Sequence, residues 1–211
     1  TGQPFYAWDR NERVDEGGIL VPENRVFHTT YDALRRPLEQ RLRINGGETL
    51  VVERLVYGES HPEAQARNLR GQLWQHFDPS GLETNERFDF KGNRLEASRR
   101  LTQTYNEPVI DWNTETPLDE RFTQRTRYDA LGRMTRLENW HRSARPDQPA
   151  PPPPATYTPQ YNQRGVLAGE ILAVQGQVTE AILNIDHDAK GQRLRVDYGN
   201  NTRDRKSTRL N

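Results

Sequence analysis

The sequence predicts an all-β protein, an antiparallel sheet built from repeated hairpins with one or two short helices. The first observation is a cassette that occurs seven times: an aromatic or polar residue, Asp or Asn, two variable residues and usually Gly. The second is a period of two after Gly191, where Leu194, Val196 and Tyr198 share one face. The third is a hydrophobic content of 32%, which favours a thin sheet over a compact globule.

The cassette has the chemistry of a β-turn. The Asp or Asn occupies the first position of the turn and accepts a hydrogen bond from the backbone two residues on. The Gly occupies the fourth position of the turn and adopts a left-handed conformation. A type I turn followed by such a Gly is a common hairpin connection. Arg35 replaces this Gly in the first cassette, and Arg67 and His187 replace the aromatic residue in two others. The predicted turn positions are Asp32, Asn68, Gly71, Asp78, Gly81, Asp89, Gly92, Asp129, Gly132, Asn162, Gly165, Asp188 and Gly191.

The N-terminal part of the chain is predicted to contain strands, turns and one short helix. Residues 1–58 read as strands and turns, and residues 48–57 are rich in Val and Leu and favour a strand. Residues 60–63 read Ser-His-Pro-Glu, a capping box with Pro in the first turn, and predict a helix over residues 61–67.

The rest of the chain alternates hairpins with two irregular segments. Residues 68–105 are predicted to form a hairpin meander, and residues 116–120 could start a second short helix. The proline-rich segment 142–159 is expected to be an exposed loop, because prolines cannot join a ladder; a ligand for a proline-reading domain is the alternative. Residues 170–174 and 178–185 are expected to form a hairpin.

The predicted domain organisation is one repeat region over residues 1–200, a fragment of a larger domain, followed by a tail. The tail, residues 201–211, is basic and lacks alternation, so it is predicted to be disordered. It also resembles translated sequencing-adapter read-through, and for that reason we leave it out of the functional argument.

Composition excludes some classes of site and partner. The 30 basic and 30 acidic residues cancel, so neither nucleic acid nor an anionic membrane is a predicted partner. The chain has no cysteine, which excludes disulfides and thiolate metal sites. No apolar run reaches the length of a membrane span.

No catalytic, cofactor-binding or metal-binding residues are predicted, and the chain is expected not to be an enzyme. The five histidines lack metal-ligand spacing, and no nucleophile elbow, P-loop or dinucleotide fingerprint occurs. Two alternatives stay open: calcium bound by cassette carboxylates, and sugars stacked on Trp74, Trp112 or Trp140. Turn formation and core packing explain the same residues more simply.

The cassettes resemble the YD repeats of the RHS (rearrangement hot spot) family. Residues 67–72, 84–93 and 184–193 carry the resemblance most specifically, and it covers roughly residues 5–200. The similarity is to the RHS-repeat part of bacterial insecticidal toxin complex (Tc) proteins and related large secreted toxins. It implies a curled strip of sheet that forms part of a hollow shell around a toxic C-terminal segment. The family's self-cleaving aspartates lie in a segment after the repeats that has no match here.

The resemblance implies a non-enzymatic structural fragment of a secreted or cell-surface bacterial toxin shell, which encapsulates a toxic effector. The implied partners are the flanking RHS repeats, the enclosed toxin segment and other toxin-complex subunits. The alternative is a repeat-based binding module for glycans or cell surfaces.

Overall fold

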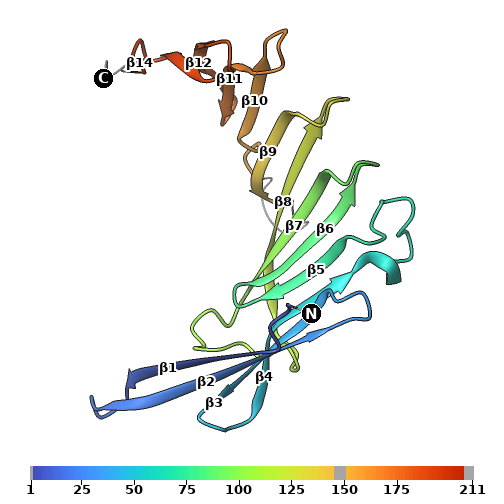
Figure 1. Ribbon diagram of the computed structural model, residues 1–211, viewed down its shortest axis with the longest axis vertical. Coiled ribbons are helices and arrows are strands. Elements are labelled where there is room, and N and C mark those ends of the chain that lie inside the picture. Colours follow the sequence, from blue (N-terminus) through green and yellow to red (C-terminus); the bar gives the residue numbers. More distant parts are fainter. Residues whose placement is uncertain (1, 145–150, 207–211) are drawn as a thin grey trace. The chain divides into compact units, whose positions relative to one another are not determined.

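The structure, a computed structural model that describes residues 2–144 and 151–206, confirms the all-β prediction. Fourteen strands form one antiparallel sheet in which the strand order follows the sequence (Figure 1). Within the described residues, the only regular helix is the one-turn 3-10 helix η1 (Gly58–Ser60). The strands are β1 (Tyr6–Val14), β2 (Leu20–Tyr31), β3 (Pro37–Ile44), β4 (Thr49–Tyr57), β5 (Leu73–Asp78), β6 (Gly81–Phe88), β7 (Arg94–Thr102), β8 (Leu118–Tyr128), β9 (Met134–Arg142), β10 (Thr156–Tyr161), β11 (Leu167–Val174), β12 (Gln177–His187), β13 (Arg193–Tyr198) and β14 (Arg203–Arg205).

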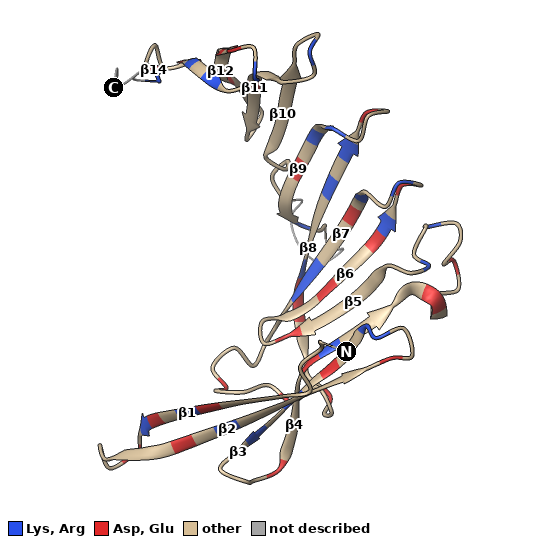
Figure 2. Ribbon diagram, viewed as in Figure 1, with Lys and Arg blue, Asp and Glu red and all other residues tan. Residues whose placement is uncertain are grey.

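The chain divides into two compact units. The first unit is Thr1–Phe88 with Ser98–Arg121, and the second is Asp89–Ala97 with Phe122–Asn211. Strands β7 and β8 therefore contribute residues to both units. Figure 2 shows basic and acidic residues interspersed along the strands of each unit, in keeping with the balanced composition.

Tight turns explain why neighbouring strands in the sequence pair with each other. In the β11–β12 hairpin, Gln175 and Gly176 both have positive φ, 51° and 81°. Two such residues in succession form a type I′ turn, whose twist matches that of the flanking strands. The expected hairpin over residues 170–185 is therefore present, with Val174 opposite Gln177.

The core of the first unit lies under a long loop between β7 and β8. Buried Val51, Ile110 and Trp112 form one cluster, against which Phe77 and Leu118 pack. The backbone N–H of Trp112 donates to the Val51 carbonyl at 2.8 Å. The Phe77 and Trp112 rings meet edge to face, with ring centres 5.1 Å apart. We call residues 110–112 the strap, because they lie on β4 and bury its apolar side chains.

The prediction of a helix over residues 61–67 is wrong. The structure has η1 and then a run of turns, in which one α-helical i→i−4 bond runs from the Arg67 N–H to the Glu63 carbonyl at 3.0 Å. The Leu69 N–H instead reaches the Ala64 carbonyl at 2.8 Å, which closes a wider turn. This wider turn places Leu69 in a fully buried position, so packing overrides the capping signal.

The prediction of a second helix over residues 116–120 is also wrong, because β8 begins at Leu118. Leu118 packs against the core cluster, and its carbonyl accepts a bond from Arg100 Nη2 at 3.2 Å. The preceding Pro117 carbonyl accepts from the Gln103 N–H at 3.0 Å. The Arg100 side chain and the Gln103 N–H thus occupy the carbonyl groups that a helix would have used.

In the second unit, apolar side chains meet across the β12–β13 ladder, where buried Ile185 lies opposite buried Val196. The proline-rich loop is shorter than expected, because β10 begins at Thr156 and includes Pro159, which lies opposite Glu170 of β11. Prolines are tolerated at strand positions that need no N–H donor. Residues 145–150 of the expected loop lie outside the described residues.

The tail differs from the expected disordered segment. Arg203–Arg205 form β14, which pairs with β13 and extends the sheet by one short strand. Because the pairing is a backbone ladder, it does not depend on the alternation that the tail lacks. Residues 207–211 lie outside the described residues.

Candidate functional site

Five of the seven predicted cassettes fold into the same turn. In each, the residue three positions after the Asp or Asn donates its N–H to the carbonyl of that Asp or Asn at 2.9–3.1 Å. The N–H of the Asp or Asn donates to the carbonyl of the residue four positions later at 2.9–3.0 Å, which closes the hairpin. These five turns begin at Asp32, Asp89, Asp129, Asn162 and Asp188.

The Asp or Asn side chain organises each turn from inside. Oδ1 of Asp129, for example, accepts the N–H of Leu131 at 2.9 Å and that of Arg133 at 3.0 Å. Asp89 and Asp188 make the same two bonds to their own turns at 2.8–2.9 Å. One acceptor thereby satisfies two backbone donors that the tight bend leaves without ladder partners.

The fourth position of these turns is left-handed. Gly92, Gly132, Gly165 and Gly191 have φ between 78° and 82°, which costs glycine little. Arg35 adopts φ 64° at the equivalent position, so the turn forms there with a residue that has a Cβ. The Asp32 hydrogen bonds therefore determine the turn even where the glycine is missing.

The other two cassettes depart from the predicted geometry. Asn68 is itself left-handed, with φ 54°, and its Nδ2 donates to the Phe88 carbonyl at 3.0 Å. The turn there starts one residue later, with the Gln72 N–H donating to the Leu69 carbonyl at 2.9 Å, and Gly71 has φ 78°. The buried Leu69 side chain accounts for this shift.

The cassette that begins at Asp78 closes as a two-residue loop, with Asp78 directly opposite Gly81. Asp78 Oδ1 still accepts the Ser80 N–H at 2.8 Å. Gly81, however, has φ 139° rather than the value near 80° of the other turns. A Cβ at Gly81 would lie 2.1 Å from the Arg100 carbonyl oxygen, so the glycine permits close backbone approach rather than a bulge.

Hydrogen bonding in the turns lowers the pKa of several of these carboxyl groups. The Asn93 amide is the main cause for Asp89, and the Arg133 N–H for Asp129; burial opposes both shifts. For Asp32, burial is the largest influence and acts upward, but the bonds from Arg36 outweigh it and the pKa falls. The ionised carboxylate is therefore the form that stabilises these turns.

Successive turns are joined by side chains that the sequence analysis missed. Arg36 bonds Asp32 through Nε at 2.7 Å, and its guanidinium carbon lies 3.9 Å from the centre of the Tyr57 ring. Arg133 bonds Asp129 at 2.7 Å and lies 4.6 Å from the Tyr161 ring centre. We call each such set an Asp–Arg–Tyr cluster. An Arg four residues after the cassette Asp is the signal that could have identified both.

Two further basic residues reach from one turn to the next through backbone carbonyls. Lys91 Nζ donates to the Ala130 carbonyl, and Arg164 donates to the carbonyls of Asp188 and Ala189 at 3.2 Å and 3.1 Å. Both occupy the position two residues after the cassette Asp or Asn. The turns of the second unit thus form a connected series of polar contacts.

The described residues bear on the calcium and sugar alternatives. Nowhere in this part of the chain do three or more His, Asp or Glu side chains gather closely enough to hold a metal ion. Trp112 is buried in the core, with 6% of its surface exposed, so it is not available to stack on a sugar. No helix in the described ranges has the length and apolarity needed to cross a membrane.

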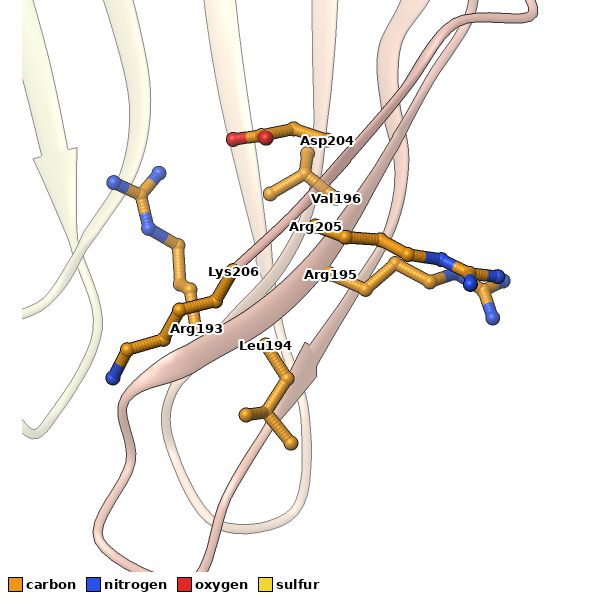
Figure 3. A pocket seen from close by; sticks show the side chains of 7 residues that line it. All are labelled: Arg193, Leu194, Arg195, Val196, Asp204, Arg205 and Lys206. Atoms are coloured by element: carbon orange, nitrogen blue, oxygen red, sulfur yellow. The ribbon is translucent and has the colours of Figure 1, made fainter. Parts of the chain in front are cut away.

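An open pocket of about 340 Å³ lies along the β13–β14 hairpin (Figure 3). Arg195 and Arg205 extend to one side of the hairpin, and Arg193 and Lys206 to the other. Arg195 also pairs with Asp197, and Lys206 Nζ donates to Gln192 at 2.8 Å. The basic groups do not converge on one point, so the pocket is not built to bind an anion.

Comparison with known proteins places this geometry in context. No family model matches the chain. It is 26% identical over 179 residues, 78% of its length, to the toxin subunit YenC2 of Yersinia entomophaga. It is 24% identical over 204 residues, 90% of its length, to the toxin subunit YenC1 of the same organism. The alignments take in 17% and 19% of those proteins, so the chain spans less than a fifth of these relatives.

Solved structures share the fold. The crystal structure of TcdB2–TccC3 matches with a TM-score of 0.71 at 20% identity, over 94% of this chain and 10% of that one. The Photorhabdus luminescens Tc holotoxin pore matches with a TM-score of 0.69 at 20% identity, over 90% of this chain and 9% of that one. The predicted resemblance to toxin-complex proteins is confirmed: the chain is similar in sequence to two toxin subunits and shares its fold with solved Tc toxin structures.

Proposed function

We propose that this chain is a non-enzymatic structural part of an RHS-type toxin shell that encapsulates a toxic effector. The observation that carries the proposal is one sheet of fourteen strands in sequence order, in which five like turns join successive strands. Such a repeat can be extended by adding hairpins, and each new strand covers the edge of the last. Similarity to two toxin subunits over most of the chain supports the same role.

The proposed partners follow from this role. They are the flanking RHS repeats, an enclosed toxin segment and other subunits of a toxin complex, in a protein that is secreted or held at the bacterial surface. A structural role of this kind needs no cofactor or metal.

A protease-protection experiment on the full-length protein tests the proposal. The effector segment should resist protease while the shell is intact and become sensitive once a turn substitution such as Gly132→Val loosens the sheet. An Arg125→Met variant, which alters an exposed ion pair with Glu96, serves as the control and should keep the cargo protected. Digestion of the cargo at the same rate in the intact protein and in isolation would contradict encapsulation.

A glycan-binding module is the second candidate, and one observation favours it. Trp8 on β1 is 72% exposed and stacks with Tyr6, with ring centres 5.9 Å apart. Exposed aromatic faces of this kind can pack on sugar rings. A glycan array separates the two functions, because a shell segment should bind nothing specifically, and Trp8→Ala should abolish any glycan binding that is seen.

A further inference from the structure

The seam between β9 and β10 has a short backbone ladder. Among the described residues, two register pairs join the strands, Thr156 with Glu138 and Tyr157 with Leu137, and the Asn139 N–H donates to the Ala155 carbonyl just before β10. On its other side, β10 pairs with β11 along its whole length, from Thr156 to Tyr161. Pro159 in the middle of β10 has no N–H to donate. Side chains must therefore hold the turn-proximal half of β10 against β9.

The Asp–Arg–Tyr cluster of the second unit lies at that open end of the seam. Asp129 fixes the Arg133 guanidinium through Nε, and the guanidinium carbon lies 4.6 Å from the Tyr161 ring centre. The Tyr161 hydroxyl donates to the Met134 carbonyl at 2.9 Å. A Cβ built on Gly165 would lie 2.9 Å from Arg133 Nη1, so Arg133 also rests against the next turn.

The first unit repeats the arrangement with the same spacing. Arg36 follows Asp32 by four residues, as Arg133 follows Asp129, and it stacks on Tyr57. The Tyr57 hydroxyl donates to the Pro37 carbonyl at 3.1 Å. Pro37 lies five residues after Asp32, just as Met134 lies five residues after Asp129. Two independent occurrences with the same offsets indicate a recognition contact rather than a chance pairing of surface side chains.

We propose that the Asp–Arg–Tyr cluster is the surface by which one hairpin recognises the next, and that the partner it fits is a strand ending in Tyr. Three requirements make the contact selective. The Asp orients the planar guanidinium, the guanidinium needs an aromatic face, and the backbone carbonyl needs a hydroxyl donor. A Leu or Phe in place of the Tyr meets one of these requirements at most. The inference concerns how the hairpins are ordered and stands whether or not the sheet encloses a cargo.

Hydrogen exchange in the full chain, read by mass spectrometry on peptides covering β10, tests the proposal. Arg133→Lys keeps the charge but loses the flat stacking surface, and Tyr161→Phe keeps the ring but loses the hydroxyl. Each should speed exchange at residues 156–161 by about three- to tenfold, as expected for loss of one cation–π contact or one hydrogen bond. The double variant should be little faster than the more affected single variant, because the stacking contact and the hydrogen bond both hold the same Tyr161 side chain in place and are lost together when it undocks.

The matched control is Arg125→Lys. Arg125 lies on β8 of the same unit and pairs with the Glu96 carboxylate at 3.1 Å rather than with a ring, so exchange in β10 should not change. Unchanged exchange in both cluster variants, fully additive effects, or an equal effect of Arg125→Lys would each overturn the proposal. If Arg133→Lys unfolds the unit as a whole, Tyr161→Phe, which preserves the ring volume, decides the question alone.

Discussion

At the scale of single residues, the Asp or Asn side chain determines the turns more strongly than the glycine does. Arg35 shows this most clearly, since it holds φ 64° while the Asp32 turn keeps both closing hydrogen bonds. A left-handed conformation costs a residue with a Cβ about 1 kcal/mol relative to glycine. The first turn therefore carries a strain that the four glycine turns avoid.

Arg35→Gly should consequently stabilise the first unit by roughly 0.5–1 kcal/mol, because it relieves the left-handed strain without touching the Asp32 bonds. Urea denaturation of the two proteins measures the change. Leu34→Gly, at the neighbouring exposed position of the same turn, is the control and should be neutral or destabilising. A loss of stability in Arg35→Gly would mean that the Arg35 side chain contributes more than its backbone costs.

Gly92→Val places a β-branched residue at φ 82° and should cost about 1–3 kcal/mol in unfolding free energy. Asp89→Ala should lower stability by a smaller amount, because the bonds from Lys91 and Asn93 are lost while the backbone remains relaxed. Chemical denaturation checks both. Melting curves identical to wild type in both variants would show that this turn does not depend on its cassette residues.

Acid should weaken the turns whose carboxyl pKa is lowered. The Arg133 N–H and, with it, the Arg133 guanidinium hold the pKa of Asp129 below the ordinary 3.8, against the effect of burial. A lowered folded-state pKa gives stability that is complete above the unfolded value and is lost as pH falls below about 4 through the folded value. Asp129→Asn, which reproduces the natural Asn162 turn, should reduce the stability difference between pH 6 and pH 3. An unchanged difference would count against this assignment.

At the scale of elements, local chemistry predicted the hairpins but not the strap. Five of the seven cassettes and the Gln175–Gly176 turn are encoded within four or five adjacent residues, and these turns fold as the sequence predicts. The cassettes at Asn68 and Asp78 differ, because Leu69 is buried and Gly81 packs closely on the Arg100 carbonyl. The strap depends on the Val51 N–H, which donates to Asp111 Oδ1 at 2.8 Å across a separation of 60 residues. Neither the buried Leu69 nor the strap leaves a short-range pattern, and the two expected helices failed next to these contacts.

Trp112 should be the main anchor of the strap. Trp112→Ala removes a buried ring from the Val51 cluster and should cost about 3–5 kcal/mol. Trp112→Phe should cost much less, because within the described structure the buried indole Nε1 has no hydrogen-bond partner to lose. Thermal or urea denaturation distinguishes the two. Equal destabilisation by both substitutions would show that the indole nitrogen, rather than apolar packing, holds the strap.

At the scale of the whole molecule, the sheet begins with an edge strand that is open to solvent. All nine residues of β1 are exposed, and in the described part of the chain β1 pairs with β2 alone. Trp8 and Val178, both more than 70% exposed, add apolar surface. Unpaired edges and exposed apolar groups are common causes of association between β-proteins.

Residues 1–200 expressed alone should therefore self-associate and bind a hydrophobic dye. Sedimentation velocity over a range of concentrations measures the association, and Trp8→Lys, which adds a charge to the edge strand, should reduce it. A monodisperse monomer with a sharp, cooperative melt would show that the isolated chain closes its own core.

Pairing of every strand with its sequence neighbours has a consequence for how the protein is made. Contacts between adjacent segments form quickly, because little chain entropy is lost in closing short loops. Each hairpin can therefore add to the sheet as soon as it leaves the ribosome or a secretion channel, without waiting for distant residues. The contact between Asp111 and Val51, across 60 residues, is an exception, and it should be a late step that locks the first unit.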